Sequence, residues 1–189
     1  MEKVVYLILF LIVKSIYLPL NKRKSRYYWK LKIDDSIPFI PVFIIPYISY
    51  FGYIVFTIFA LWNTRFIFEF FTAYIITYVI AGIFWYCVPN GVRRPTITGK
   101  DIFSRLTSYV YGHDEDTNGF PSAHVFATLI CSYYLFLPFP GAFPLILFMA
   151  ISIIASTVLV KQHYAIDILG GILVFFVSVP IAKFLLLQI

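Results

Sequence analysis

The residues best suited to chemistry in this sequence are two histidines, each with polar neighbours at a regular spacing. His163 and Asp167 are four residues apart, so a helix would place both on one face. The carboxylate could then accept a hydrogen bond from one ring nitrogen and leave the other free as a nucleophile. A structural His–Asp pair explains such spacing in most soluble proteins, but inside a membrane protein an ionisable pair more often marks a functional site.

The tetrapeptide Pro121-Ser122-Ala123-His124 is typical of the start of a helix. Proline fits the first helical position, so the amides of residues 122–124 and the Ser122 hydroxyl are expected to face an anion. His124 could then pass a proton to an oxygen that leaves this anion. Taken alone, a capping serine and an interfacial histidine are the simpler explanation of the motif.

Cations near these motifs suit the oxygens of a phosphate group. Arg94 offers a planar fork of donors, and Lys161 offers a point charge two residues before His163. Snorkelling or anchoring at the membrane surface is the alternative, and it is the interpretation we favour for Arg93 and Lys100.

An acidic run, residues 114–116 beside His113, could suggest a site for a divalent metal. Its carboxylates are consecutive rather than separated on fixed elements, so a solvated loop is the better interpretation. Cys87 and Cys131 lie in apolar segments and form no recognisable pair or ligand set. The sequence therefore calls for no metal and no other cofactor.

The elements that must position these residues are membrane helices. Hydrophobic residues make up 61% of the 189 residues and charged residues only 13%, which excludes an ordinary soluble domain. Much of the formal charge of +6 lies in residues 22–32, where attraction to anionic lipid is the simplest interpretation and a nucleic-acid partner is not expected. We predict one all-α domain over residues 1–189, a polytopic membrane helical bundle of about six transmembrane helices, with an N-terminal segment and basic loop over 1–35.

Uncharged runs and helix-breaking residues predict where these helices lie. The first segment, Val4 to Leu20, contains Lys14 and either crosses the membrane or lies along its surface. The later elements are a helix from about Tyr47 to Thr64, a segment from Phe70 to Val88, a short surface helix near 102–110, two helices dividing the run 117–160 near Pro138–Pro144, and a last helix from about His163 toward Ile189. If each segment crosses once, the polar motifs between 93 and 167 gather at one membrane face.

Three motifs in this order resemble the type 2 phosphatidic acid phosphatase superfamily: Arg94-Pro95, then Pro121-Ser122-x-His124, then Ser156 followed by His163 and Asp167. The resemblance implies a six-span core and a phosphohistidine mechanism. His163 would attack phosphorus, His124 would protonate the departing lipid oxygen and Asp167 would steady the imidazolium. The phosphate oxygens would be held by Arg94, Ser122, the amide of Ala123, Lys161 and Ser156.

Two positions depart from the family's pattern. Cys87 stands where the first motif usually has a lysine, and Thr157 stands where an arginine usually follows the serine of the third motif. Lys161, Arg93 or Lys100 must therefore replace two phosphate-binding cations. The stretch 161–164, Lys-Gln-His-Tyr, is similar to the branch related to inositol phosphorylceramide synthases, in which an alcohol accepts the phosphoryl group, so hydrolase and transferase both stay open.

The main functional hypothesis is hydrolysis of a lipid phosphomonoester or pyrophosphate, such as phosphatidic acid, phosphatidylglycerol phosphate or a polyprenyl diphosphate. A headgroup transferase is the alternative, and it should have a second cavity beside His163 for its acceptor. A non-catalytic scaffold would need no particular geometry among His124, His163 and Asp167. The expected partners are the lipid phosphate and membrane lipids, while the sequence does not set the number of copies.

The orientation of the bundle is contested by two arguments. The resemblance implies a multi-pass protein, in the cell membrane, whose site faces out of the cytoplasm. The basic residues 22–32 would lie on that same side if six spans are present, and the positive-inside rule then predicts the opposite orientation. We adopt the family's orientation as the expectation.

Overall fold

The computed structural model describes residues 1–187, and within this part of the chain the regular elements are all helical. Two isolated β-bridges, Tyr27 with Asn90 and Gly91 with Thr117, are the only strand-like pairings described there. The α-helices are α1 (Glu2–Ser15), α2 (Tyr17–Asn21), α3 (Ile33–Ser36), α4 (Ile44–Leu61), α5 (Ile67–Cys87), α6 (Ile102–His113), α7 (Ala123–Phe136), α8 (Phe143–Leu159) and α9 (Ala165–Leu186), with 3-10 turns η1 (Pro41–Phe43) and η2 (Pro140–Ala142) before α4 and α8.

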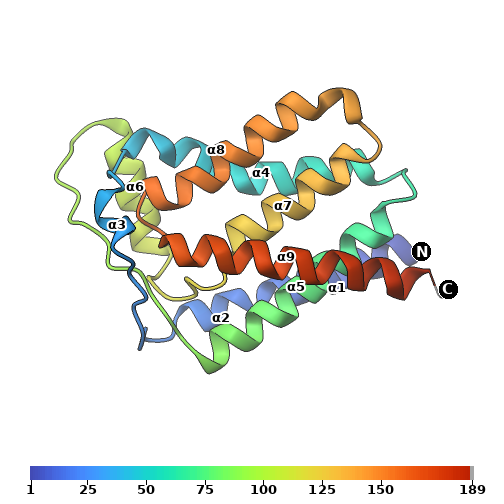
Figure 1. Cartoon of the computed structure of the whole chain (residues 1–189), viewed down its shortest axis with the longest axis horizontal. Helices are drawn as coiled ribbons and strands as arrows, with labels where there is room; N and C mark the ends of the chain where they lie inside the picture. Colours follow the sequence, from blue (N-terminus) through green and yellow to red (C-terminus); the bar gives the residue numbers. More distant parts are fainter. Residues whose placement is uncertain (188–189) are drawn as a thin grey trace.

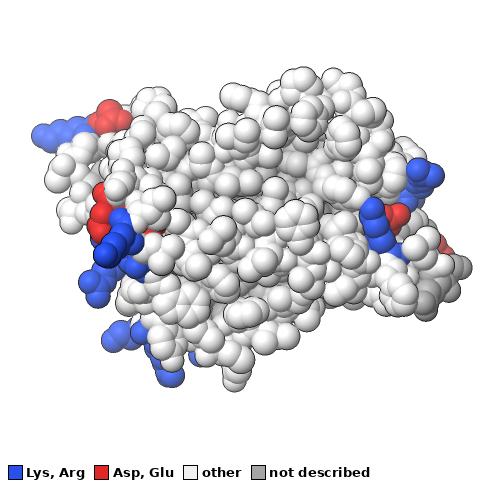
Figure 2. Space-filling model, in the orientation of Figure 1, with Lys and Arg blue, Asp and Glu red and all other residues white. Residues whose placement is uncertain are grey.

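The long helices form a bundle, and the short helices α3 and α6 lie together at one of its ends (Figure 1). Five segments are long and apolar enough to cross a membrane, namely Glu2–Asn21, Pro41–Leu61, Ile67–Cys87, Pro140–Leu159 and Ala165–Leu186, and α7 is a shorter apolar helix. Lys, Arg, Asp and Glu side chains gather at the two ends of the visible face, with an uncharged band between them (Figure 2). The predicted polytopic bundle of about six helices is confirmed.

Helix α5 is the centre of the packing because it contacts α1, α7 and α9. Its buried aromatic side chains, with Tyr74 and Trp85 among the largest, fill the interior together with Phe126 and Tyr134 of α7. Large side chains such as Phe59 are exposed on the outside of the bundle, as expected where a helix meets acyl chains. Packing among the helices therefore comes from aromatic contacts and close fit rather than from ion pairs.

The first segment packs within the bundle instead of lying apart from it. The ring of Phe10 on α1 lies 5.6 Å from that of Phe71 and 4.5 Å from that of Tyr74, both on α5. Of the two arrangements left open for residues 4–20, the structure has the one in which the helix runs beside the other spans (Figure 1). This brings Lys14 and Tyr17 to the polar end of the bundle interior.

The predicted starts of two helices, α4 and α9, differ from the structure. Helix α4 begins at Ile44 rather than Tyr47, because Pro46 falls in the first turn, where its missing N–H has no intrahelical partner to lose. The last helix begins at Ala165 rather than His163, because the Asp167 carboxylate accepts the N–H of Tyr164 and so caps the helix there. The end of that predicted helix, residues 188–189, lies outside the described residues.

Candidate active site

The two histidines of the sequence motifs meet inside the polar end of the bundle. His124 is the second residue of α7, His163 lies in the bend between α8 and α9, and their ring centroids are 6.0 Å apart. Each is only 7% exposed. Within the described residues, Nε2 of His124 and Nδ1 of His163 have no hydrogen-bond partner. Two buried imidazoles therefore lie one small group apart.

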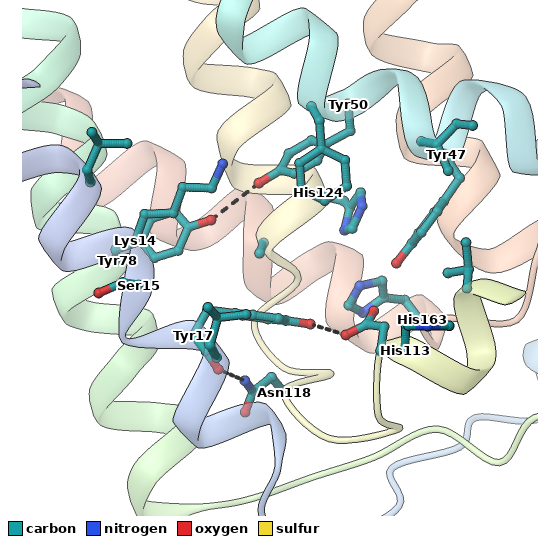
Figure 3. Close-up of a pocket in the computed structure, with 17 residues that line it drawn as sticks. Lys14, Ser15, Tyr17, Tyr47, Tyr50, Tyr78, His113, Asn118, His124 and His163 are labelled. Atoms are coloured by element: carbon teal, nitrogen blue, oxygen red, sulfur yellow. Dashed lines mark hydrogen bonds between the residues drawn. The ribbon is translucent and has the colours of Figure 1, made fainter.

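Helix α4 holds the His124 ring between aromatic side chains. The Tyr47 ring stacks on it with centroids 4.1 Å apart, and the Tyr50 ring lies at the same distance at a tilt. Figure 3 shows both tyrosines beside His124. His163 lies below His124 in this view. Tyr47 and Tyr50 were not predicted as site residues because, in a chain this rich in tyrosine, nothing in their spacing sets them apart.

Asp167 supports His163 from a different position than the sequence predicted. The two residues do not share a helix face, since His163 precedes α9 and Asp167 stands in the first turn. Oδ2 of Asp167 still lies 3.4 Å from Nδ1 of His163, and the carboxylate is fully buried. The distance is that of an ion pair rather than a close hydrogen bond, and such contacts commonly shorten when a ligand binds.

Asn90 is a supporting residue that the sequence reasoning missed. Its Nδ2 lies 3.5 Å from Oδ1 of Asp167, and its Oδ1 accepts the N–H of Phe120 at 2.7 Å. Its side chain is fully buried and so ties the chain before Pro121 to the start of α9. The motif Pro-Asn-Gly at 89–91 was interpreted only as a helix breaker, and a buried asparagine has no other sequence signal.

Helix α7 begins two residues later than the sequence predicted. Ser122 is the N-cap and Ala123 the first helical residue, so Pro121 precedes the cap, after a cis peptide bond. The Ser122 N–H donates to the backbone carbonyl of Asp167 at 3.1 Å and is not free for an anion. Its hydroxyl is buried without a described partner, while Ala123 lines the same cavity as His124.

Close approach of α9 to α7 depends on glycine. A Cβ on Gly171 would lie 2.7 Å from Cβ of Val125 and 3.0 Å from the carbonyl oxygen of Ser122. A Cβ on Gly170 would meet the Phe120 ring at 2.3 Å. Any larger residue would separate the helix carrying His124 from the one carrying Asp167.

The predicted cations lie around a polar cavity, but each is already engaged. Arg94 donates to the carbonyls of Tyr111, Asp114 and Glu115, and its guanidinium lies 4.8 Å from the Tyr111 ring. Lys161 donates to the carbonyls of Asp34 and Ile37. Partial burial lowers the pKa of Lys161 from its usual value.

The remaining predicted residues divide between the cavity and the helix interior. Arg93 lines the polar cavity, and its backbone N–H donates to the Tyr164 hydroxyl at 3.0 Å. Ser156 is fully buried, and its hydroxyl donates to the carbonyl of Ile153 on its own helix. The structure therefore brings Arg93 to the site but leaves Ser156 inside helix α8.

The acidic run is fastened to the N-terminal segment rather than being simply a solvated loop. The Tyr17 hydroxyl donates to Oδ1 of Asp114 at 2.9 Å, and the Ser25 hydroxyl donates to Asp116 at 2.9 Å. Burial raises the pKa of Asp114, although Tyr17 and Arg94 oppose the shift. Among residues 1–187, no three His, Cys, Asp or Glu side chains are grouped so as to hold a metal ion.

Two cavities meet at His163. One, of about 440 Å³, is mainly apolar and also includes His124, Tyr47, Tyr50 and Lys14. The other, of about 350 Å³, is lined by Arg93, Arg94, Lys161 and further polar residues. A site with an apolar side, a cationic side and a histidine shared between them suits a lipid that carries a phosphate.

The model of one protein family, the PAP2 superfamily, matches residues 91–185, which is half of the chain. The chain belongs to the PAP2 superfamily. No curated protein and no solved structure matches it. PAP2 members are generally phosphatases, so membership supports a lipid phosphatase or phosphotransferase in general.

The PAP2 match includes His124, His163 and Asp167 but begins after Asn90. Several groups that line the apolar cavity around His124, among them Lys14, Tyr47 and Tyr50, therefore lie in the part of the chain that the family model does not cover. The apolar cavity is therefore lined by residues from both inside and outside the family match.

Proposed function

We propose that this protein hydrolyses a phosphomonoester or pyrophosphate bond of a membrane lipid through a phosphohistidine on His163. The observation that carries the proposal is the pair of buried imidazoles, with centroids 6.0 Å apart, where an apolar and a cationic cavity meet and Asp167 lies 3.4 Å from Nδ1 of His163. A scaffold would gain nothing from burying Nε2 of His124 without a partner, because an unsatisfied buried polar atom costs about 1 to 3 kcal/mol.

In the first step, His163 attacks phosphorus and the bond from phosphorus to the lipid oxygen breaks. The imidazole gains positive charge as it reacts, and the Asp167 carboxylate at 3.4 Å stabilises that charge. His124 gives its proton to the departing oxygen and thereafter can take one from water. Water then attacks the phosphohistidine and releases inorganic phosphate.

Charge that develops on the phosphate oxygens needs donors that are already in place. Arg93, Arg94 and Lys161 line the cationic cavity beside His163, and the Ser122 hydroxyl and Ala123 amide stand at the start of α7. Arg94 and Lys161 would exchange contacts with backbone carbonyls for phosphate oxygens. No step of this scheme requires a metal ion.

A lipid headgroup transferase is a second candidate, favoured by the cavity of about 350 Å³ beside His163. An alcohol held there could replace water in the second step. Asp34 and Asp35 line this cavity and could accept hydrogen bonds from hydroxyl groups. The proposal keeps hydrolysis first, because members of the PAP2 superfamily are generally phosphatases.

The proposed location is the cell membrane, with the site on the extracytoplasmic face. The family resemblance supports this orientation. Most of the 15 lysines and arginines lie in segments at the site end of the bundle, and the positive-inside rule argues for the reverse.

Phosphate release from detergent-solubilised protein in the presence of EDTA tests the proposal. Phosphatidic acid, phosphatidylglycerol phosphate and a polyprenyl diphosphate are compared, with His163→Ala and an added alcohol such as inositol in parallel. Release that survives EDTA and is lost in His163→Ala supports the hydrolase. A phosphorylated alcohol without free phosphate establishes the transferase, and no reaction with any lipid or acceptor refutes both.

A further inference from the structure

Lys14 is a cation in the wall of the apolar cavity and takes no part in the scheme above. It stands near the end of α1, and Figure 3 shows its side chain reaching into the cavity toward Tyr50 and His124. Its Nζ lies 5.5 Å from the centre of the Phe51 ring on α4. Among the described residues, Nζ has no hydrogen-bond acceptor and no carboxylate within ion-pair distance.

Snorkelling does not explain this side chain. Lys14 is seven residues before Asn21, the end of α2, which corresponds to roughly 10 Å along a helix. The side chain instead crosses to α4, where its Nζ lies near the Phe51 ring, and the cavity that it enters is mainly apolar. A partly buried cation in a mainly apolar cavity is costly without a counter-ion, so its retention there calls for an anion.

The cavity does contain one carboxylate, that of Asp114, but it is engaged elsewhere. Tyr17 donates to its Oδ1 at 2.9 Å, and Arg94 donates to its backbone carbonyl at 2.6 Å. Lys14 and Asp114 therefore stand at different places in the cavity without pairing.

The position of Lys14 relative to the two histidines indicates which part of the lipid substrate its ammonium group would contact. The group transferred lies at His163, and the leaving oxygen lies at His124. In Figure 3, Lys14 and His163 lie on different sides of His124, so Lys14 faces the portion of the lipid beyond the leaving oxygen. The transferred phosphate is served by the cationic cavity, which Lys14 does not line.

We infer that Lys14 binds a second phosphate that stays with the leaving group, so that the substrate is a lipid diphosphate or a comparable lipid with two phosphates. This rests on the proposed function and narrows its substrate class. The bond between the terminal phosphorus and the bridging oxygen breaks, and the electron pair leaves with that oxygen. The lipid phosphate departs with the proton from His124, Lys14 neutralises its remaining charge, and water later releases the terminal phosphate from His163.

A lipid monophosphate such as phosphatidic acid has no second anionic group for Lys14 to bind, because its leaving group is a neutral alcohol. The same cavity then holds a cation facing an apolar chain. Lys14 is therefore a residue that discriminates between two classes of substrate which the histidines alone would treat alike.

The test compares farnesyl diphosphate with farnesyl phosphate, which share one chain and differ by one phosphate. The variants are Lys14→Met, Lys14→Arg and, as a matched loss of one cation, the exposed Lys22→Met. We expect Lys14→Met to lower kcat/KM for the diphosphate about 10- to 100-fold, the worth of a charge-assisted contact. Activity on the monophosphate should change little, Lys14→Arg should restore most of the loss, and Lys22→Met should resemble wild type.

Monophosphate turnover by the same variant reports whether it is folded. Equal losses on both substrates, or no loss on either, would overturn the inference while leaving the phosphatase intact. Wild-type protein that hydrolyses only the monophosphate would do the same. Wild-type protein that hydrolyses neither substrate, nor any lipid of the first assay, would overturn the proposed function together with the inference. Phosphatidylglycerol phosphate, assayed against phosphatidic acid, then tells whether a glycerol-linked second phosphate serves as well as a diphosphate.

Discussion

Replacing Asn90 tests whether the Asp167 carboxylate must be ionised and held in place. In Asn90→Ala, the N–H of Phe120 loses its acceptor and Asp167 loses a long contact of 3.5 Å. The unsatisfied N–H should lower the free energy of unfolding by about 1 to 3 kcal/mol. We expect a moderate loss of activity, on the order of tenfold, since His163 keeps its contact with Asp167.

Asn90→Asp keeps the acceptor for Phe120 but places a second carboxylate 3.5 Å from the first. With an effective dielectric constant of about 20, two unit charges at this distance repel by at most about 5 kcal/mol. This repulsion exceeds the cost of the Phe120 hydrogen bond that Asn90→Ala removes. One of the two carboxyls will therefore keep its proton to a higher pH than an ordinary aspartate. When protonated, it can donate to Asp167 as Asn90 does.

The assay is phosphate release as a function of pH, with the apparent unfolding temperature of both variants measured in the same detergent. Asn90→Asp should approach wild type at the acidic end and fall below Asn90→Ala as the pH rises. Identical pH profiles for the two variants would refute the view that Asn90 serves the charge on Asp167.

Three further outcomes are expected. Asp114→Asn should stabilise the protein by about 1 kcal/mol near pH 8, because burial raises the pKa of Asp114 and its charge is costly in the folded state. The advantage should fade as the pH falls toward 3.8, the ordinary aspartate value, where Asp114 is protonated in the folded and the unfolded state alike; matching Tm curves at every pH would contradict this. Gly171→Ala should cost about 1 to 3 kcal/mol and separate the histidines, whereas Gly52→Ala, with open space around its Cβ, should not; equal Tm values for the two would contradict the packing argument. The exposed Cys87, at the site end of α5, should react with an impermeant thiol reagent from outside the cell if the proposed orientation holds, and labelling only after lysis would reverse it.

The helices were predictable from the sequence because a membrane imposes simple rules on it. Charge cannot lie cheaply at the bilayer centre, so the charges at Arg65 and Arg93 and the prolines 138–144 mark the ends of helices that the structure places within a few residues. The exact starts of α7 and α9 were missed because they depend on contacts between distant residues. The N–H of Ser122 binds the carbonyl of Asp167, and the Asp167 side chain caps Tyr164, and neither bond leaves a local signal.

The candidate reacting residues were predictable from the sequence, whereas their surroundings were not. His124, His163 and Asp167 stand in motifs with a characteristic spacing, and the structure gathers them. Asn90 and Tyr47 are ordinary residues in their own segments, and only the packing of α4 and α5 against α7 gives them a role. Lys14 was visible as a charge in an apolar run, but snorkelling explained it until the structure showed which way the side chain points.

The most direct test of the central claim is to locate the phosphate on the enzyme during turnover. The phosphorylated protein is quenched at alkaline pH, where phosphohistidine survives, cleaved after lysine and arginine, and analysed by mass spectrometry. Cleavage after Lys161 and Lys183 gives a peptide, 162–183, in which His163 is the only histidine, while His124 lies in a different peptide. Phosphate on residues 162–183 is the predicted result. Phosphate on the peptide containing His124, or continued turnover with no phosphorylated histidine, would contradict the account.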